Sequence, residues 1–409
     1  MTRSRSRRDS PRVGMFGRLG SGNIGNDASL DVLIGDLRAR HPAAVVDFMC
    51  SGPEVVARQY GLAARHLHWF HSSAIARSRP RVLARIAVGA AVDAWRTAAW
   101  VRRHDAVIVP GMGTLESTLQ ERPWQMPWSL FLLSLSGRLF GVKVALACVG
   151  ASYIPEPVNR WLMVNAARMA HYRSFRDLRS RSELARMGVP CTSDPVFPDL
   201  VLAVSRPPTP RSSGPLTVAV GVMAFHGSSS ERGRSKQIHA SYVDSMVRVV
   251  TALLDAGHGV RLVIGDAEDD HTALTILDLV HGHRTSAAER VSYEPAASYD
   301  DVMTQLATTD VVAAARYHNV VAGLALHKPT MAIAYGDKHE ALLTQMGVPD
   351  LFQPIRDLDP DLLVSQLALL DRRRAQVSDV LRRHHDANRT AVEQQLEELD
   401  AALLGGTRA

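Results

Sequence analysis

The chain has 409 residues, 46% of them hydrophobic and 22% charged, and its formal net charge is +6. This length and composition suit a soluble protein with two hydrophobic cores that need no support from disulfides or metal ions. The small charge excess argues against nucleic-acid binding. The three cysteines, Cys50, Cys148 and Cys191, show no CxxC spacing. We therefore expect buried free thiols in a reducing compartment rather than a zinc site.

No stretch of the sequence reaches the roughly 18 uncharged apolar residues that a membrane span requires. The closest runs, 128–149 and 82–101, are interrupted by charged side chains. No apolar segment follows the charged N-terminus, as a secretory signal would require. We therefore expect a cytoplasmic protein. A disordered basic tail over residues 1–11 would allow peripheral contact with an anionic membrane surface, and a solvated tail without a partner is the alternative.

The first half of the chain alternates short apolar runs with helical patterns. This alternation is typical of a parallel sheet covered on both faces. We therefore expect an N-terminal α/β domain over residues 12–204. Its predicted strands are 13–16, 45–49, 106–109, 142–149 and 172–175, and its predicted helices are 28–40, 54–62 and 80–103.

Residues 205–215 contain four prolines and three serines, which suit the interior of neither a helix nor a sheet. We expect this linker to separate the first domain from a C-terminal α/β domain over 216–359 and a helical segment over 360–409. The predicted fold is α/β, with two doubly wound Rossmann-like domains. In the second domain the predicted strands are 216–222, 260–265, 310–314 and 330–334, and a helix is expected at 242–256.

Ligands of doubly wound sheets bind beyond the carboxyl ends of the strands, so the loops there carry the candidate residues. In the first loop, glycines let backbone N–H groups approach a ligand at a helix N-terminus. A dinucleotide site is a weak interpretation, because only Asp47 offers the acid that such a site needs. A plain turn capped by an Asn or Asp side chain is the alternative. The candidates are Gly22, Asn23, Gly25, Asn26 and Asp27.

Two further loops of the first domain carry candidates. After strand 106–109, two glycines permit close backbone approach and two polar residues could meet a sugar hydroxyl, although a plain turn fits nearly as well. After strand 172–175, the guanidinium of Arg176 could hold a carboxylate or phosphate through two N–H groups. A surface pair between Arg176 and Asp177 is the alternative. The candidates of the earlier loop are Gly111, Gly113, Thr114 and Glu116.

Two consecutive strands of the second domain end in cationic or protonatable residues. Arg316 and His318 follow strand 310–314, and Lys338 follows strand 330–334. Because the carboxyl ends of parallel strands meet at one edge, we expect these side chains to converge. A cationic cluster with a histidine suits a small, highly charged anion that needs proton transfer. The alternative is that His318 caps a helix and Lys338 is solvated.

Together these motifs resemble the polysaccharide pyruvyltransferase family, and they occur in family order from about residue 13 to residue 347. Asn26 stands where the family has an acid, and residues 222–224 lack an arginine that many members carry. Pro110 and Met112 replace glycines of the family's central cluster. The matching segments are 22–27, 110–113, Arg-Asp-x-x-Ser at 176–180, Asp-Pro at 194–195, and 316–318 with 335–338.

The resemblance implies a fold similar to the GT-B glycosyltransferases, with the active site between the domains. It implies that phosphoenolpyruvate donates its three-carbon unit to a hexose of a cell-surface polysaccharide or glycolipid, forming a pyruvate ketal and releasing phosphate. Arg176 and Arg316 would bind the donor, His318 would be the general acid/base, and Lys338 would neutralise the leaving phosphate. The loops at 22–27 and 111–116 would hold the acceptor sugar, free or lipid-linked. No metal ion is expected, and no cofactor besides the donor substrate.

Three other functions remain open from the sequence. A nucleotide-sugar glycosyltransferase would need a carboxylate pair for a ribose, of which Glu340 is one candidate member. A non-catalytic glycan- or nucleotide-binding protein would not need Arg316, His318 and Lys338 together. Nucleic-acid binding through residues 1–11 is the least favoured, because the charge excess is small.

Overall fold

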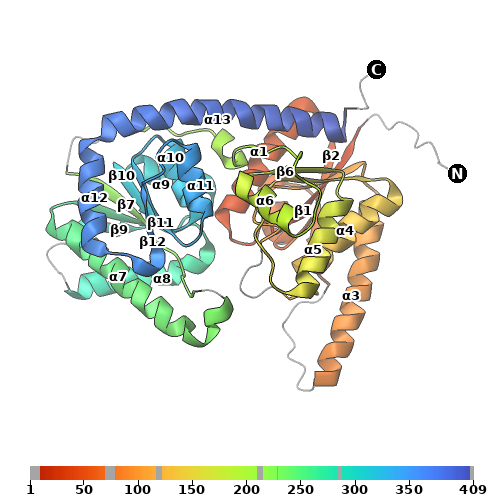
Figure 1. Cartoon of the computed structure of the whole chain (residues 1–409), viewed down its shortest axis with the longest axis horizontal. Coiled ribbons are helices and arrows are strands. Elements are labelled where there is room, and N and C mark those ends of the chain that lie inside the picture. Colours follow the sequence, from red (N-terminus) through yellow and green to blue (C-terminus); the bar gives the residue numbers. More distant parts are fainter. Residues whose placement is uncertain are drawn as a thin grey trace. The chain divides into compact units, whose positions relative to one another are not determined.

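The computed structural model describes residues 10–69, 79–116, 122–209, 215–227, 229–283 and 288–405 (Figure 1). The chain divides into two compact units. Unit 1 holds Met1–Ser21, Ser29–Leu200 and Glu393–Ala409, and unit 2 holds Gly22–Ala28 and Val201–Val392. The glycine-rich segment Gly22–Ala28 therefore belongs to the same unit as the second sheet.

Unit 1 is built on six parallel strands. They are β1 (Arg12–Gly17), β2 (Val45–Cys50), β3 (Ala64–His66), β4 (Ala106–Val109), β5 (Lys143–Val149) and β6 (Tyr172–Phe175). Their order in the sheet is β3-β2-β1-β4-β5-β6. Because β-α-β crossovers are right-handed, connections that leave β1 and β4 in opposite directions place their helices on opposite faces. The helices between these strands are α1 (Ile24–Arg40), α2 (Pro53–Tyr60), α3 (Arg79–Val101), α4 (Met126–Phe140) and α5 (Pro157–Met169), and α6 (Leu178–Arg186) follows β6.

Unit 2 repeats this plan. Its strands are β7 (Thr217–Gly221), β8 (Gly259–Val263), β9 (Val291–Tyr293), β10 (Val311–Ala314), β11 (Thr330–Ala334) and β12 (Phe352–Pro354). They pair in parallel in the order β12-β11-β10-β7-β8-β9. Its helices are α7 (Ser235–Asp255), α8 (Asp270–His283), α9 (Tyr299–Ala307), α10 (Tyr317–Ala325), α11 (Lys338–Gln345), α12 (Pro360–Arg372) and the part of α13 (Arg374–Leu403) that precedes Glu393.

Both sheets reverse their strand order beside the first strand of the unit, between β1 and β4 and between β7 and β10. Ligands of open α/β sheets bind outside the carboxyl ends of the strands at such a switch point. The prediction of two doubly wound α/β sheets is thus confirmed. The candidate site residues follow β1, β4, β6, β10 and β11, either in the loop after the strand or in the first turn of the next helix.

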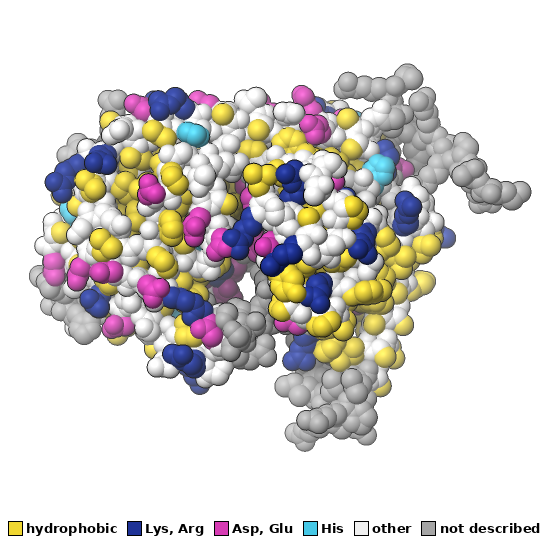
Figure 2. Space-filling view, viewed as in Figure 1, with side chains coloured by type: hydrophobic (Ala, Val, Ile, Leu, Met, Phe, Trp, Pro, Cys, Tyr) yellow, Lys and Arg dark blue, Asp and Glu magenta, His cyan; other side chains and the backbone are white. Residues whose placement is uncertain are grey.

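The longest apolar run of the sequence, residues 128–149, forms a helix and a strand. α4 ends at Gly141, whose left-handed backbone (φ 66°) turns the chain into β5. Among the described residues, no helix combines the length and the apolar character needed to cross a membrane. Figure 2 shows hydrophobic and basic side chains gathered on the surface over α3, α4 and α5.

Several elements differ from the prediction. α1 begins at Ile24 instead of residue 28, so Gly25 is helical. The three-residue strands β3, β9 and β12 and the helices α4, α5, α8, α9 and α11 were not predicted, and the C-terminal segment is two helices. Residues 1–9 of the predicted basic tail and 210–214 of the predicted linker lie outside the described residues. All three cysteines are buried free thiols, as predicted.

Candidate functional site

Arg316 is the centre of an ion-pair cluster at the carboxyl edge of the unit 2 sheet. It lies between β10 and α10. Its Nε donates to Oδ2 of Asp269 (2.8 Å), and its Nη2 donates to Oδ1 of Asp269 and to Oε1 of Glu268, both at 2.6 Å. Asp269 is fully buried and also accepts the N–H of Ala224 at 2.8 Å. Carboxylates of its own unit therefore hold the predicted donor-binding arginine in a two-pronged grip.

This cluster fixes the charge of Arg316. Burial alone would lower the pKa of Arg316, but the hydrogen bonds and negative charge of Asp269 and Glu268 outweigh burial and raise that pKa. Burial raises the pKa of the nearby Asp266 carboxyl, against the opposing effect of Arg316. Within the described part of the chain, these hydrogen bonds of Arg316 are donated by Nε and Nη2, and none of them is donated by Nη1.

The glycine-rich segment packs on the same edge. Asn23 pairs with Asp266 as an isolated antiparallel bridge, and its Nδ2 donates to Oδ2 of Asp266 at 3.0 Å. Its Oδ1 accepts the N–H of Asn26 at 3.3 Å, which caps the first turn of α1. The cap is therefore Asn23, and the capping alternative considered for Asn26 or Asp27 is wrong.

His318 lies against Gly25. A Cβ on Gly25 would lie 1.9 Å from Nδ1 of His318, so only glycine leaves room for the imidazole. His318 is the second residue of α10. The predicted general acid/base and part of the predicted acceptor loop thus meet within unit 2.

Lys338 reaches the same neighbourhood from the first turn of α11. Its Nζ lies 4.8 Å from the ring centre of Tyr335 and 5.7 Å from that of Tyr317. The Tyr317 ring also meets the His318 ring edge-on, with centroids 5.2 Å apart. Lys338 and His318 therefore share a contact with Tyr317, and the aromatic faces stabilise the ammonium through cation–π attraction.

Two buried residues that the sequence analysis did not single out support these loops. The ring nitrogens of His339 lie 3.1 Å from the carbonyl oxygens of Gly336 and Ala315, so His339 links the loops after β11 and β10. Asn319 packs on Gly265, where a Cβ would lie 2.7 Å from Oδ1 of Asn319. Their only sequence signal was adjacency to Lys338 and His318.

Arg176, the other predicted donor-binding arginine, belongs to unit 1. Its buried guanidinium forms a close ion pair with Glu116, and it lies 3.7 Å from Oδ2 of Asp177 and 4.0 Å from Oδ2 of Asp199. The pair with Glu116 covers Gly150, where a Cβ would come within 2.5 Å of both side chains. Glu116, predicted to meet a sugar hydroxyl, is thus the closest counter-ion of Arg176. The alternative pair of Arg176 with Asp177 forms as a longer contact, and it involves a buried guanidinium instead of a surface one.

The glycines after β4 make room for atoms of the protein itself. A Cβ on Gly113 would lie 2.7 Å from the carboxyl carbon of Glu116, and a Cβ on Gly111 would lie 3.1 Å from the carbonyl oxygen of Cys148. Thr114 is buried beside them. This loop therefore shapes the surroundings of Glu116 and Arg176, and its contact with an acceptor stays a prediction.

Asp47, the acid considered for a dinucleotide site, serves the core of unit 1. Its Oδ1 accepts from Nε1 of Trp100 at 2.6 Å and lies 2.9 Å from Nε2 of His104. Burial alone would raise the pKa of Asp47, but the contacts with His104 and Trp100 outweigh burial and lower that pKa. Asp47 therefore links β2 to Trp100 and His104 in unit 1.

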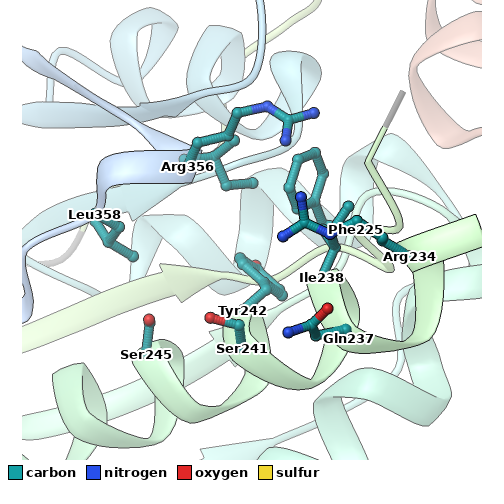
Figure 3. Close-up of a pocket in the computed structure, with 10 residues that line it drawn as sticks. Phe225, Arg234, Gln237, Ile238, Ser241, Tyr242, Ser245, Arg356 and Leu358 are labelled. Carbon is teal, nitrogen blue, oxygen red and sulfur yellow. The ribbon is translucent and has the colours of Figure 1, made fainter. Parts of the chain in front are cut away.

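A cavity of about 240 Å³ in unit 2 offers a second polar site (Figure 3). Arg234, Arg356, Ser241 and Ser245 point into it beside aromatic rings. Tyr242 also lines it, and the Tyr242 hydroxyl accepts the N–H of Met223 one residue before the Asp269 contact. Arg356 is paired with Glu231, so the guanidinium of Arg234 and the serine hydroxyls are the groups here that suit a phosphate or a sugar. Sequence reasoning missed this cavity because its arginines lie far apart in the chain.

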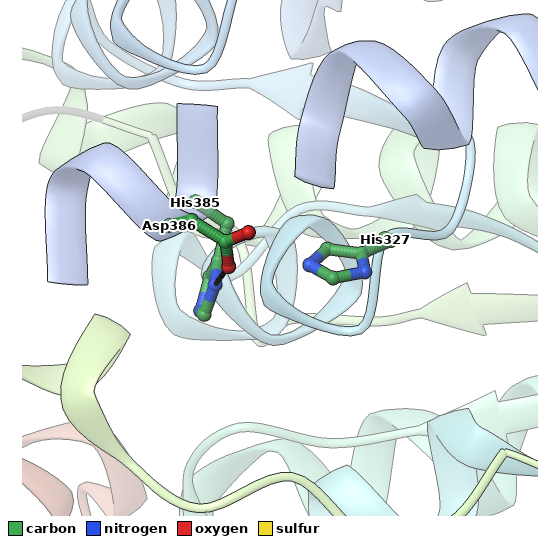
Figure 4. A group of neighbouring side chains, drawn as sticks. All are labelled: His327, His385 and Asp386. Carbon is green, nitrogen blue, oxygen red and sulfur yellow. Dashed lines mark ion pairs between the residues drawn. The ribbon is translucent and has the colours of Figure 1, made fainter. Parts of the chain in front are cut away.

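His327, His385 and Asp386 form a group whose ligand-type atoms lie within 4.8 Å of one another (Figure 4). Such groups can hold a metal ion. Here Nη1 of Arg206 lies 3.0 Å and 2.5 Å from the two ring nitrogens of His327, and its positive charge opposes a cation at this place. Burial, with Arg206 and His385, lowers the pKa of His327 to about 4. The expectation of no metal stays a prediction.

Comparison with known proteins bears on both the sequence and the fold. The family model described as polysaccharide pyruvyl transferase matches residues 23–337. This match includes the glycine-rich segment from Asn23 onward, Arg176, and the segment from Arg316 to the residue before Lys338. Among curated proteins no sequence match was found.

Solved structures resemble the chain in fold at low sequence identity. UDP-GlcNAc 2-epimerase from Neisseria meningitidis bound to UDP-GlcNAc has a TM-score of 0.59 at 10% identity, covering 95% of this chain and 99% of its own. MnaA of S. aureus, solved with UDP, has a TM-score of 0.61 at 11% identity, covering 96% and 97%. MurG of Acinetobacter baumannii has a TM-score of 0.53 at 11% identity, covering 95% and 99%. The fold is that of GT-B epimerases and glycosyltransferases, as predicted.

Proposed function

The chain belongs to the polysaccharide pyruvyl transferase family, and we propose that it moves the three-carbon unit of phosphoenolpyruvate onto a hexose of a cell-surface polysaccharide or glycolipid. The product is a cyclic ketal of pyruvate on two sugar hydroxyls, and phosphate is released. The family assignment supports a transferase acting on polysaccharide. The donor, the ketal and the roles of individual residues are parts of this proposal.

The contact between His318 and Gly25 carries the proposal. It places a protonatable ring at the N-terminal end of α10, where the helix dipole and backbone N–H groups favour an anion. Lys338 adds a positive charge near the ring of Tyr317, which His318 also contacts. Reaction of phosphoenolpyruvate requires a group that donates a proton and a positive charge that binds its anionic groups. His318 and Lys338 would supply these two.

The reaction proceeds by protonation and two additions. His318 in its protonated form donates a proton to C3 of phosphoenolpyruvate, which makes C2 electrophilic. A sugar hydroxyl forms a bond to C2 and loses its proton to a base. The C2–O bond to phosphate then breaks, and a second hydroxyl closes the ketal and releases the other proton. The two hydroxyl protons replace the proton given to C3 and protonate the phosphate, so atoms and charges balance.

The arginines and Lys338 would bind the anionic groups of the donor. Nη1 of Arg316, which the carboxylate cluster leaves, is the nitrogen available for a donor oxygen, while Asp269 holds the guanidinium plane. Lys338 would neutralise the leaving phosphate, an effect that is stronger in a site from which water is excluded. Arg176 would bind the other anionic group of the donor, provided that Glu116 does not fully compensate the positive charge of the Arg176 guanidinium.

Phosphate release from phosphoenolpyruvate, measured with a glycan extract from cells lacking the protein, tests this function. Wild-type protein should release phosphate only with the extract, and mass spectrometry should show an acceptor heavier by one pyruvate less one water. His318→Ala should slow release by about a hundredfold or more, as expected for loss of a general acid. Arg316→Lys should also be inactive, because a lysine cannot keep the two-pronged grip.

The exposed His281 on α8 provides the matched control. His281→Ala should keep full activity, and both histidine variants should keep the melting temperature of the wild type. Full activity of folded His318→Ala would contradict its role. Absence of acceptor-dependent phosphate release in the wild type would contradict the proposed donor.

A nucleotide-sugar glycosyltransferase remains the alternative, since two of the structural neighbours are described with UDP or UDP-GlcNAc. Such an enzyme needs free carboxylates for a ribose. Two acids at the edge of the unit 2 sheet, Glu268 and Asp269, are instead paired with Arg316, and Asp266 accepts a hydrogen bond from Asn23. A ligand that binds the folded state raises the melting temperature. A melting temperature that rises with phosphoenolpyruvate and does not rise with UDP-sugars would support pyruvyl transfer over glycosyl transfer.

A further inference from the structure

The outward face of α3 is apolar except for Arg85, whereas Asp93 and Arg96 bond to other parts of unit 1. Asp93 is buried, and its Oδ1 accepts the N–H of Trp69 at 2.7 Å and pairs with Nη1 of Arg96 at 3.1 Å. Nη2 of Arg96 in turn donates to the carbonyl oxygen of His66 at 2.8 Å. The exposed positions of the helix are Ala84, Arg85, Ala87, Val88, Ala91 and Trp95. This is the reverse of an ordinary surface helix, whose solvent face is polar.

The apolar surface continues over α4 and α5. Trp128 of α4 donates from Nε1 to the carbonyl oxygen of Ala90 on α3 at 3.3 Å. Its ring stacks on Phe131 (5.8 Å between centroids), which contacts Trp161 of α5 at 5.3 Å. The aromatic row joins the three helices into one layer of unit 1. Trp95 is 73% exposed and Trp161 57% exposed, and Val88, Val158 and Leu139 are also exposed.

The charge of these helices is strongly one-sided. α3, α4 and α5 together hold seven arginines and one acid, Asp93, which is buried. Their net charge is therefore +6, equal to the formal net charge of the whole chain. Arg96 pairs with Asp93, so the described basic side chains that remain on this layer are Arg85, Arg138, Arg160 and Arg168. Figure 2 shows this mixture of hydrophobic and basic side chains over the three helices.

We propose that the outer face of α3, α4 and α5 docks on an anionic lipid bilayer. Tryptophan is enriched at membrane–water interfaces, and arginines around an apolar helix face are attracted to anionic headgroups. Each basic residue near such a surface contributes on the order of a fivefold increase in binding. This layer has two exposed tryptophans and, in its described parts, four arginines without an exposed acid, so it is complementary to that surface in both respects.

This docking stands apart from the proposed pyruvyl transfer, because vesicle binding needs no substrate. It bears on that function in one way. A protein held at a membrane surface meets acceptor sugars that are attached to lipids. The face would then select for lipid-linked glycans by location, without contacting the sugar.

Sedimentation of the full-length protein with vesicles tests the proposal. We expect binding to phosphatidylcholine vesicles that contain phosphatidylglycerol, weaker binding at high salt, and little binding to phosphatidylcholine alone. Trp95→Ser with Trp161→Ser should reduce the partition coefficient by about tenfold or more, because two large apolar side chains leave the interface. Arg138→Gln should reduce it by about fivefold.

Matched controls come from another helix and from the tail. Leu362→Ser with Leu369→Ser removes two exposed apolar side chains of α12 and should leave binding unchanged. Replacing the four arginines at positions 3, 5, 7 and 8 with serine should weaken binding while the effect of the tryptophan variant persists. All variants should keep the wild-type melting temperature.

Three results would overturn the proposal. The first is no binding of the wild type to anionic vesicles. The second is binding that the tail variant abolishes and the tryptophan variant leaves unchanged. The third is a dimer in solution that Trp95→Ser dissociates, because the face would then be an interface between two copies of the chain.

Discussion

Gly25 and His318 are 293 positions apart in the chain and in direct contact, with room between them for no side chain larger than hydrogen. A Cβ on Gly25 would overlap the imidazole at Nδ1, Cγ and Cε1. The helix that begins in the glycine-rich loop therefore sets the position of the ring at the start of α10. Several predictions depend on this contact and on the ion pairs beside it.

Gly25→Ala should remove activity with little loss of stability. Alanine favours the helix by about 1 kcal/mol over glycine, but its methyl group must displace His318. We expect acceptor-dependent phosphate release to fall by about a hundredfold or more. Gly35→Ala is the control, since Gly35 lies in the same helix with no atom within 4 Å of its would-be Cβ. Equal activity of the two alanine variants would show that the position of His318 does not matter.

Asp269→Asn should destabilise unit 2. It removes one partner of a buried ion pair with Arg316, which costs about 3–5 kcal/mol. That corresponds to a melting temperature lower by roughly 10 °C for a unit of this size. The control is Asp379→Asn, which removes an exposed pair with Arg382 on α13 and should change stability by less than about 1 kcal/mol. Calorimetry measures the melting temperature of both variants. Equally small decreases in the two would contradict a tight ion-pair cluster around Arg316.

Glu116→Gln should strengthen donor binding. The substitution removes the nearest counter-charge of Arg176, while Asp177 and Asp199 still prevent its full isolation. The guanidinium then attracts an anionic ligand more strongly. We expect a lower KM for phosphoenolpyruvate and an unchanged KM for the acceptor. A raised acceptor KM alone would mean that Glu116 contacts the sugar and that Arg176 does not bind the donor.

The stability of unit 2 should fall in mild acid because of His327. Its folded pKa of about 4 lies below its ordinary value of 6.5, through burial, Arg206 and His385. Between these two values the unfolded chain binds more protons, so the free energy of unfolding decreases as pH falls from about 6.5 towards 4. Urea titrations at pH 7 and pH 5 measure this, and His327→Gln should show a smaller pH effect. The same decrease in His327→Gln as in wild type would assign it to other groups.

The three cysteines should be unreactive in the native protein. All are buried, and burial raises the pKa of the Cys148 and Cys191 thiols, which suppresses the reactive thiolate. A thiol-specific colorimetric reagent should detect none of them before unfolding and all three in denaturant. Rapid reaction of any thiol in the native state would contradict their burial.

The sequence by itself determined the class of fold, the family and most strand ends. Apolar runs that alternate with helical patterns are local signals. For this reason most ends of the longer strands were predicted to within two residues. The strands of three residues, β3, β9 and β12, are too short to show a period, and they were missed. The family motifs also marked Arg176, Arg316, His318 and Lys338 without any structure.

Only the tertiary structure decided which side chains are partners. Arg316 lies 47 positions from Asp269, and Arg176 lies 60 positions from Glu116. No local pattern encodes such distances, because packing of whole strands and helices brings the groups together. For the same reason the glycine-rich loop was expected with the N-terminal domain, whereas it packs on the second sheet beside His318. The sequence named the charged groups, and the fold determined which of their charges are already compensated.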